Sequence, residues 1–93
     1  MEYRWDEENV EHLGRHGITP NIANDVLDVG EYLVVSSSNS PANRKAVIGY
    51  TSRSRFVTVI AERTEQPDVW RPVTGWWSTA KEVARYTAAK ARR

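Results

Sequence analysis

Hydrophobic residues change their spacing along this chain, from a helical period in the first 30 residues to the alternation that is typical of strands. Ile22, Val26 and Val29 recur at i, i+4 and i+7, which predicts one face of an amphipathic helix. Beyond residue 30, short apolar runs are separated by polar turns, a pattern that predicts strands. The predicted strands span residues 31–37, 44–52, 55–63 and 70–77.

Capping residues indicate where three helices begin and end. Asp6 is a suitable N-cap for a first helix, and Thr19, followed by a proline, is one for a second helix that ends at Gly30. Thr79 and Glu82 fit a capping box at the start of a last helix. Helices and strands grouped in this order favour an α+β fold.

We therefore expect one α+β domain over residues 1–93, with two N-terminal helices, a four-stranded antiparallel sheet and a C-terminal helix. The helices are expected to pack on one face of the sheet. The short link 52–54 predicts an antiparallel hairpin between the second and third strands. Pro72 predicts an edge position or a bulge in the fourth strand, and alternation places Trp76 and Trp77 on its opposite faces.

The composition is that of a globular protein without a disulfide framework. Of the 93 residues, 40% are hydrophobic and 27% charged, and the lack of cysteine excludes a thiolate metal site. No apolar run approaches the roughly 20 residues that a membrane helix needs, and the N-terminus lacks the pattern of a signal peptide. We expect a cytoplasmic protein that makes no membrane contact.

The formal net charge of +1 conceals an uneven distribution. Residues 1–31 hold eight acidic and two basic side chains, a balance of −6, whereas residues 32–93 hold eleven basic and four acidic ones, a balance of +7. The basic part could meet a phosphate backbone or an acidic protein partner. Alternatively, the two parts complement each other within one fold, and charge alone does not separate these interpretations.

Short motifs over nearly the whole chain resemble those of BrnT-like toxins. These motifs are Trp5-Asp6-Glu7, Asn9, His12, His16-Gly17-Ile18-Thr19-Pro20, the hairpin 48–51 to 55–60, and Glu82 with Tyr86. The resemblance implies a RelE-like fold and a ribonuclease toxin of a type II toxin–antitoxin system, which inhibits translation and is neutralised by a cognate antitoxin protein. It also implies RNA cleavage without a metal or cofactor, with the 2′-hydroxyl of the RNA as nucleophile. A homodimer and a toxin–antitoxin hetero-oligomer both stay open.

Four arginines at strand ends and turns are candidates for holding phosphate. Guanidinium groups bind phosphate bidentately and stay charged at any working pH, and cleavage needs such charge because negative charge builds on the phosphate. Arg63, which matches a family arginine, is predicted to be catalytic together with Arg53 and Arg71, and Arg55 to bind RNA. This interpretation requires the sheet to gather them on one concave surface; otherwise they are solvated surface side chains.

Other side chains are candidates for proton transfer or for contact with RNA. Histidine is the one side-chain type suited to proton transfer near neutrality without perturbation, and Tyr86 could move a proton or stack on a base, so His12 and Tyr86 are predicted to be catalytic. Lys45, Lys81 and Trp77 are predicted to bind RNA, because bases stack on exposed aromatic rings. A metal site is not expected, since the two histidines, four residues apart, have no evident third ligand.

Two other hypotheses belong to different classes. In the family, one or two arginines commonly end the last strand, where this chain has Trp76-Trp77. This departure favours a catalytically inactive BrnT-like module that binds a protein partner or nucleic acid. The short turn between the first two helices also allows a helix-turn-helix DNA-binding unit, but both helices are acidic, the wrong charge for a major groove.

Overall fold

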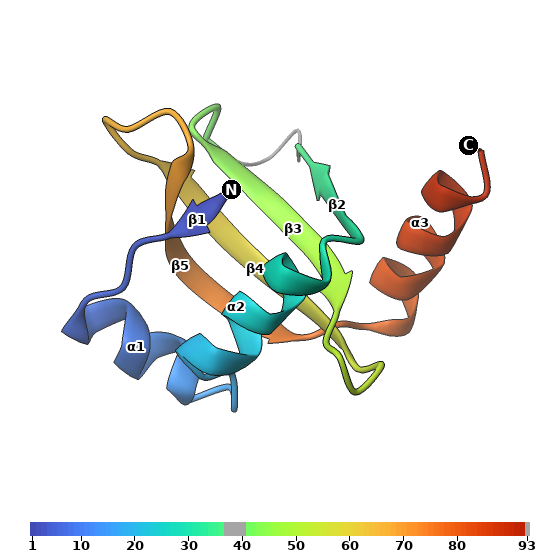
Figure 1. Cartoon of the computed structure of the whole chain (residues 1–93), viewed down its shortest axis with the longest axis horizontal. Coiled ribbons are helices and arrows are strands. Elements are labelled where there is room, and N and C mark those ends of the chain that lie inside the picture. Colours follow the sequence, from blue (N-terminus) through green and yellow to red (C-terminus); the bar gives the residue numbers. More distant parts are fainter. Residues whose placement is uncertain (37–40, 93) are drawn as a thin grey trace.

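The computed structural model describes residues 1–36 and 41–92, and within them it contains three helices and five strands (Figure 1). The helices are α1 (Glu7–Gly14), α2 (Pro20–Val29) and α3 (Ala80–Lys90). The strands are β1 (Glu2–Tyr3), β2 (Tyr32–Val35), β3 (Arg44–Tyr50), β4 (Phe56–Arg63) and β5 (Val69–Trp77). The last residue of the strand predicted over 31–37, and part of the loop after it, lie outside the described residues.

The predicted N-caps are confirmed at all three helices. The Asp6 carboxylate accepts a hydrogen bond from the Asn9 backbone, and the Asn9 side chain accepts one from the Asp6 backbone, which completes a capping box. Thr19 caps α2, and Thr79 caps α3 in a second box. Gly30 ends α2 with φ of 81°, a left-handed conformation that glycine adopts without steric cost.

The sheet has five strands in the order β1-β5-β4-β3-β2, so the prediction of a four-stranded antiparallel sheet is wrong. The additional strand, β1, pairs in parallel with the start of β5, while the other pairs are antiparallel. The backbone N–H groups of Glu2 and Arg4 donate to the carbonyls of Asp68 and Trp70, each at 2.9 Å. A two-residue strand shows no periodicity in the sequence, because only its pairing with a distant segment defines it.

Of the two alternatives predicted from Pro72, an edge position or a bulge, the bulge is confirmed, because β5 lies between β1 and β4. Ile60 is paired with Thr74 and Ala61 with Pro72, so Val73 is an extra residue on β5. A proline has no N–H to donate, and a bulge accommodates it within a paired strand. The Pro72 carbonyl accepts a hydrogen bond of 3.0 Å from the buried Asn9 side chain, which ties α1 to β5.

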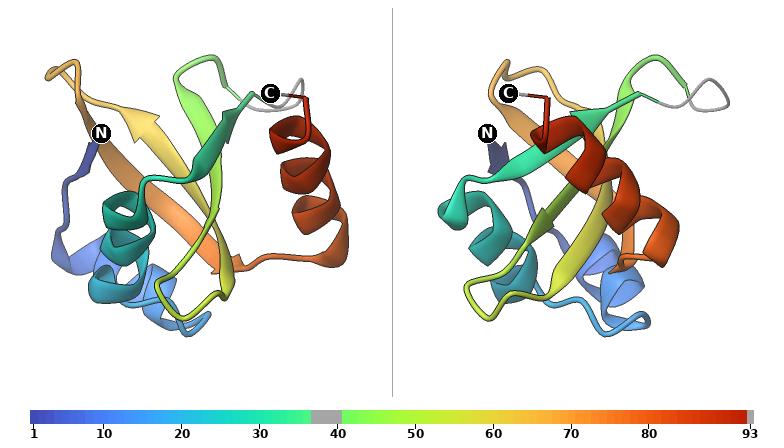
Figure 2. Two further views of the ribbon diagram at one scale, coloured as in Figure 1. Left: turned by 45° about the vertical axis from the view of Figure 1, so that its right-hand side comes forward. Right: turned by 90° about the vertical axis from the view of Figure 1, so that its right-hand side faces the viewer.

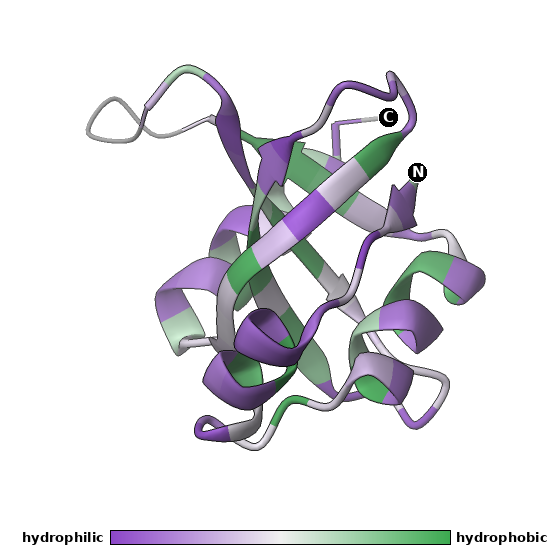
Figure 3. Ribbon diagram, turned by 90° about the vertical axis from the view of Figure 1, so that its left-hand side faces the viewer, coloured by the Kyte–Doolittle hydropathy of each residue, from purple (hydrophilic) through white to green (hydrophobic). Residues whose placement is uncertain are grey.

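The main hydrophobic core lies between the sheet and the two N-terminal helices. Val57, Val59 and Ala61 point into it from alternate positions of β4. Apolar side chains of β1, α1, α2 and the link between these two helices complete it: Tyr3, Leu13, Ile18, Ala23 and Val26. The outer surface of α1 is largely hydrophilic, as Figure 3 shows.

Helix α3 lies on the opposite face of the sheet, so the prediction that the helices share one face is wrong (Figure 2). The Tyr86 ring contacts Phe56 and Tyr50, with ring centroids 5.1 and 6.2 Å apart. The Tyr86 hydroxyl donates to the Glu31 carbonyl at 2.7 Å. Because β4 carries apolar residues on both faces, α3 shields the face that α1 and α2 leave open. No helix of the described part is long and apolar enough to cross a membrane.

Candidate functional site

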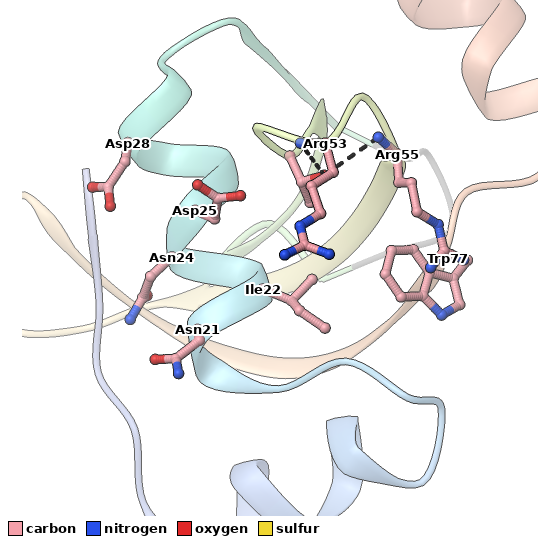
Figure 4. A pocket seen from close by; sticks show the side chains of 9 residues that line it. Asn21, Ile22, Asn24, Asp25, Asp28, Arg53, Arg55 and Trp77 are labelled. Carbon is pink, nitrogen blue, oxygen red and sulfur yellow. Dashed lines mark hydrogen bonds between the residues drawn. The ribbon is translucent and has the colours of Figure 1, made fainter.

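A cavity of about 700 Å³ lies between α2 and the turn that joins β3 to β4 (Figure 4). We call it the hairpin pocket. Its lining comes from α2, from the turn and from the end of β5: Asn21, Ile22, Asn24, Asp25, Asp28, Thr51, Arg53, Arg55 and Trp77. Three of the predicted site residues, Arg53, Arg55 and Trp77, therefore share this pocket.

Hydrogen bonds hold the turn in place beside α2. The buried Thr51 hydroxyl accepts from the backbone N–H groups of Arg53 and Arg55, at 3.2 and 3.3 Å. Asp25 Oδ2 accepts from both the backbone N–H and the hydroxyl of Ser52, each at 2.9 Å. These hydrogen bonds fix the backbone of the turn, so the Cα atoms of Arg53 and Arg55 have defined positions beside α2.

Arg55 and Trp77 form a stacked pair at the β5 side of the pocket. The Arg55 guanidinium carbon lies 3.7 Å from the centroid of the Trp77 ring, within the range of a cation–π contact. Trp77 is half-buried and packs against the core, while Arg55 and Arg53 are exposed. Within the part of the chain that the structure describes, neither arginine forms an ion pair. Both charges are therefore available to an anion.

The opposite side of the pocket is acidic and amide-bearing. It is formed by one face of α2, at spacings of i, i+3, i+4 and i+7: Asn21, Asn24, Asp25 and Asp28. Figure 4 shows Asp25 on the side of α2 that faces Arg53, and Ile22 directed toward the space beside Trp77. Asn24 also accepts a hydrogen bond of 3.2 Å from the Trp5 indole. The pocket thus has a cationic side and an acidic side, separated by apolar surface.

The sheet does not gather the four predicted arginines on one surface. Arg63 ends β4, seven residues from Phe56 at the pocket end, a distance of about 23 Å along a strand. Its guanidinium lies 5.1 Å from the Trp70 ring. Only Arg53 and Arg55 therefore share a site.

Arg71 is bound by carboxylates at the N-terminus of α1. Its Nε donates to Asp6 Oδ2 at 2.8 Å, and its Nη2 donates to Glu8 Oε1 at 3.3 Å. The hydrogen bond from Arg71, with one from the Asn9 backbone, holds the pKa of the Asp6 carboxyl below its ordinary value of 3.8. The same bond raises the pKa of Arg71. This arginine is part of the contact between α1 and β5.

The predicted proton-transfer residues lie elsewhere. His12 is exposed on α1, 5.9 Å from the His16 ring between centroids, and α1 ends at Gly14, before His16. Tyr86 is buried against the sheet. Neither His12 nor Tyr86 lines the hairpin pocket. No group of three or more potential ligands among residues 1–36 and 41–92 could hold a metal ion.

The two predicted lysines are also outside this pocket. Lys45 donates to the Ser36 hydroxyl. Lys81 lines a second cavity, of about 640 Å³, between α3 and the other face of the sheet. Trp76 lies on that face, with its indole N–H donating to Glu82 at 2.9 Å, so the prediction that Trp76 and Trp77 face opposite ways is confirmed.

The uneven charge distribution is partly used within the fold. Of the five ion pairs among the described residues, three join an acid of residues 1–31 to a base of residues 32–93. They are Arg71 with Asp6, Arg71 with Glu8, and Lys90 with Glu31. Ion pairs within the fold therefore neutralise some of the excess basic residues, and Arg53 and Arg55 take part in none of these three pairs.

Sequence reasoning did not identify the α2 side of the pocket. The signal was present, because four polar side chains recur on one face of a helix whose other face is apolar. No model of a known protein family matches this chain, and no curated protein matches it.

Proposed function

We propose that this protein binds single-stranded RNA in the hairpin pocket, as the RNA-targeting toxin of a toxin–antitoxin pair. The observation that carries this proposal is the Arg55–Trp77 stack with Arg53 beside it in one pocket. Guanidinium groups suit phosphate, and the tryptophan ring offers apolar surface to a base. A cytoplasmic location and neutralisation by an antitoxin belong to the same proposal, which the resemblance to BrnT-like toxins supports.

The dimensions of the pocket fit this use. Its volume of about 700 Å³ falls within the range of roughly 300–1,000 Å³ that is common for ligand sites. Such a pocket holds a nucleotide or two of a flexible strand, whereas the stiff backbone of a duplex would not fold into it. A splayed single strand can place a base in the pocket and its phosphate against the arginines.

RNA cleavage without a metal is the catalytic form of this proposal. Water would take the proton of the 2′-hydroxyl as the 2′-oxygen attacks the adjacent phosphorus, and water would return a proton to the 5′-oxygen as its bond to phosphorus breaks, which yields a 2′,3′-cyclic phosphate and a 5′-hydroxyl end. Arg53 and Arg55 share one site, and two guanidinium groups can stabilise the charge that builds on the phosphate.

The second candidate is a binding module that does not cleave RNA. The observation that favours it is the position of the other predicted catalytic residues: Arg63, Arg71, His12 and Tyr86 do not line the pocket. Each has a local contact instead, such as the bonds from Arg71 to Asp6 and from Tyr86 to the Glu31 carbonyl.

The experiment measures binding and cleavage in the same samples. A fluorescent single-stranded RNA decamer is titrated with the wild type, with the double variant Arg53→Ala/Arg55→Ala, and with Arg15→Ala as control. Arg15 is an exposed arginine at the C-cap of α1 that does not line the pocket. We expect the double variant to bind about tenfold or more weakly, and the control to bind like the wild type. Equal affinities for all three proteins would contradict RNA binding in the hairpin pocket.

Cleavage is then examined by gel electrophoresis of the same RNA in the presence of EDTA. New fragments that end in a 2′,3′-cyclic phosphate, absent with the double variant, would identify a nuclease. Intact RNA that stays bound would identify the binding module. Expression in bacteria gives an independent readout, because a toxin arrests growth and translation and the double variant should not.

A further inference from the structure

We propose that the hairpin pocket is selective for guanine, with Asp25 as the residue that recognises the base. This inference rests on the proposed RNA-binding function and adds the identity of the bound nucleotide. It is based on the acidic side of the pocket, because the binding of phosphate does not explain why carboxylates line that side.

Carboxylates are unfavourable neighbours for a phosphate. At neutral pH Asp25 and Asp28 offer only hydrogen-bond acceptors and carry negative charge. A nucleotide in the pocket would therefore place its phosphate at Arg53 and Arg55, and a part rich in donors at α2. Between the arginines and the acidic residues, the pocket is lined by Ile22 and Trp77, whose apolar surfaces suit the faces of a base.

Guanine is the base whose edge complements a carboxylate. Its Watson–Crick edge carries two adjacent donors, N1–H and the N2 amino group. Adenine and cytosine each place a ring-nitrogen acceptor beside their amino group, and uracil flanks its one N–H with two carbonyls, so all three set an acceptor against the carboxylate. Bases that are read in single strands are recognised through this edge.

Asp25 is held in position for such a contact. Its Oδ2 accepts two hydrogen bonds from Ser52, each at 2.9 Å, which link α2 to the hairpin turn, so Oδ1 is the oxygen that would accept from the N1–H and the N2 amino group of guanine. The carboxylate lies on the side of α2 that faces Arg53 (Figure 4). A carboxylate that is fixed before binding loses less entropy when it accepts the donors of a base.

The test compares pentanucleotide RNAs that differ only in the central base within a uridine background. The central positions are guanine, inosine, adenine, cytosine and uracil, and affinity is measured by fluorescence anisotropy. We expect the guanine RNA to bind about tenfold more tightly than those with adenine, cytosine or uracil, and inosine, which lacks the N2 amino group, to fall between. Equal affinities across the five RNAs would overturn the guanine inference and leave RNA binding intact.

Variants of the chain test the role of Asp25. Asp25→Asn replaces one acceptor by a donor and is expected to reduce the guanine preference to less than about threefold, while Asp68→Asn, an exposed acid in the β4–β5 link, leaves it unchanged. Ser52→Ala keeps the carboxylate and removes one of the bonds that fix it, so we expect a partial loss. A guanine preference that persists in Asp25→Asn would overturn the assignment, and binding of none of the RNAs by the wild type would refute the proposed function itself.

Discussion

At Gly49 the backbone of β3 passes so close to α2 that no side chain fits. A Cβ atom there would lie 2.6 Å from Cγ1 of Val26 and 2.8 Å from Cβ of Tyr32. We predict that Gly49→Ala lowers the free energy of unfolding by about 1–3 kcal/mol, because α2 must move away from the sheet. Urea unfolding measures this. Gly14→Ala is the control, since its Cβ would meet nothing within 4 Å, and an equal loss in both variants would contradict the steric explanation.

Asn9 shows how one buried amide joins three segments. Its Nδ2 donates to the carbonyls of Arg4 and Pro72, each at 3.0 Å, while its oxygen accepts from the Asp6 backbone. We predict that Asn9→Ala lowers the free energy of unfolding by about 1–3 kcal/mol, because it removes the hydrogen bond that the buried Asn9 amide donates to the Pro72 carbonyl. Asn9→Asp should be worse near neutral pH, since a carboxylate would face two carbonyls. Thermal unfolding of both variants gives the ranking, and the reverse order would contradict this role.

At the scale of elements, the contact between α1 and β5 gives stability a dependence on pH. The hydrogen bond from Arg71 lowers the pKa of Asp6 in the folded protein below 3.8, so the pair stabilises the fold above that pH. This stabilisation is lost as the pH falls through the lowered value. We predict that the melting temperature of the wild type falls more steeply below pH 4 than that of Asp6→Asn, which keeps a side-chain cap but cannot ionise. Parallel melting curves for the two proteins across this range would contradict the coupling.

A second ion pair supplies the comparison for that measurement. The hydrogen bond from Arg4, the residue after β1, lowers the pKa of Glu65 in the β4–β5 link, so this carboxylate also stabilises the fold above the lowered pKa. In Glu65→Gln alone, the melting temperature should still fall below pH 4, because Asp6 still loses its stabilising charge there. In the double variant Glu65→Gln/Asp6→Asn, the melting temperature should depend still less on pH, because the two ion pairs lie in separate places and their contributions add.

Elements that depend on local signals could be predicted from the sequence, and those that depend on distant pairing could not. The caps at Asp6, Thr19 and Thr79 lie within three residues of their partners, and each was read correctly. The pairing of β1 with the sheet could not be predicted, because Glu2 pairs with Val69, across most of the chain. The side of the sheet taken by α3 was misjudged for the same reason, since both faces of β4 are apolar.

The candidate site shows the same limit. Arg53, Arg55 and Trp77 could be chosen for their chemistry, but no pattern in the sequence separates them from Arg63 and Arg71. That separation depends on where along β4 and β5 each arginine lies, and on the carboxylates beside Arg71. Asp25 enters the pocket only because α2 packs beside a turn that comes 27 residues later at Ser52.

At the scale of the whole molecule, the number of basic residues exceeds the number that the proposed RNA site uses. Three ion pairs hold part of the basic excess against the acidic N-terminal region, while the hairpin pocket has two guanidinium groups outside any ion pair of the described chain. The salt dependence of RNA binding distinguishes a local site from a broad basic surface. For single strands, the logarithm of affinity falls with the logarithm of salt by about 0.7 for each phosphate neutralised.

Two phosphate contacts therefore predict a slope of about −1.4, measured by anisotropy titrations at several salt concentrations. Arg53→Ala should reduce the slope to about −0.7, whereas Lys81→Ala, on the opposite face of the sheet, should leave it unchanged. A wild-type slope of about −3 or steeper, which becomes less steep in Lys81→Ala, would place the RNA on the α3 face instead. Because Arg53 and Lys81 lie in separate cavities, the two variants assign the contact to one face of the sheet or the other.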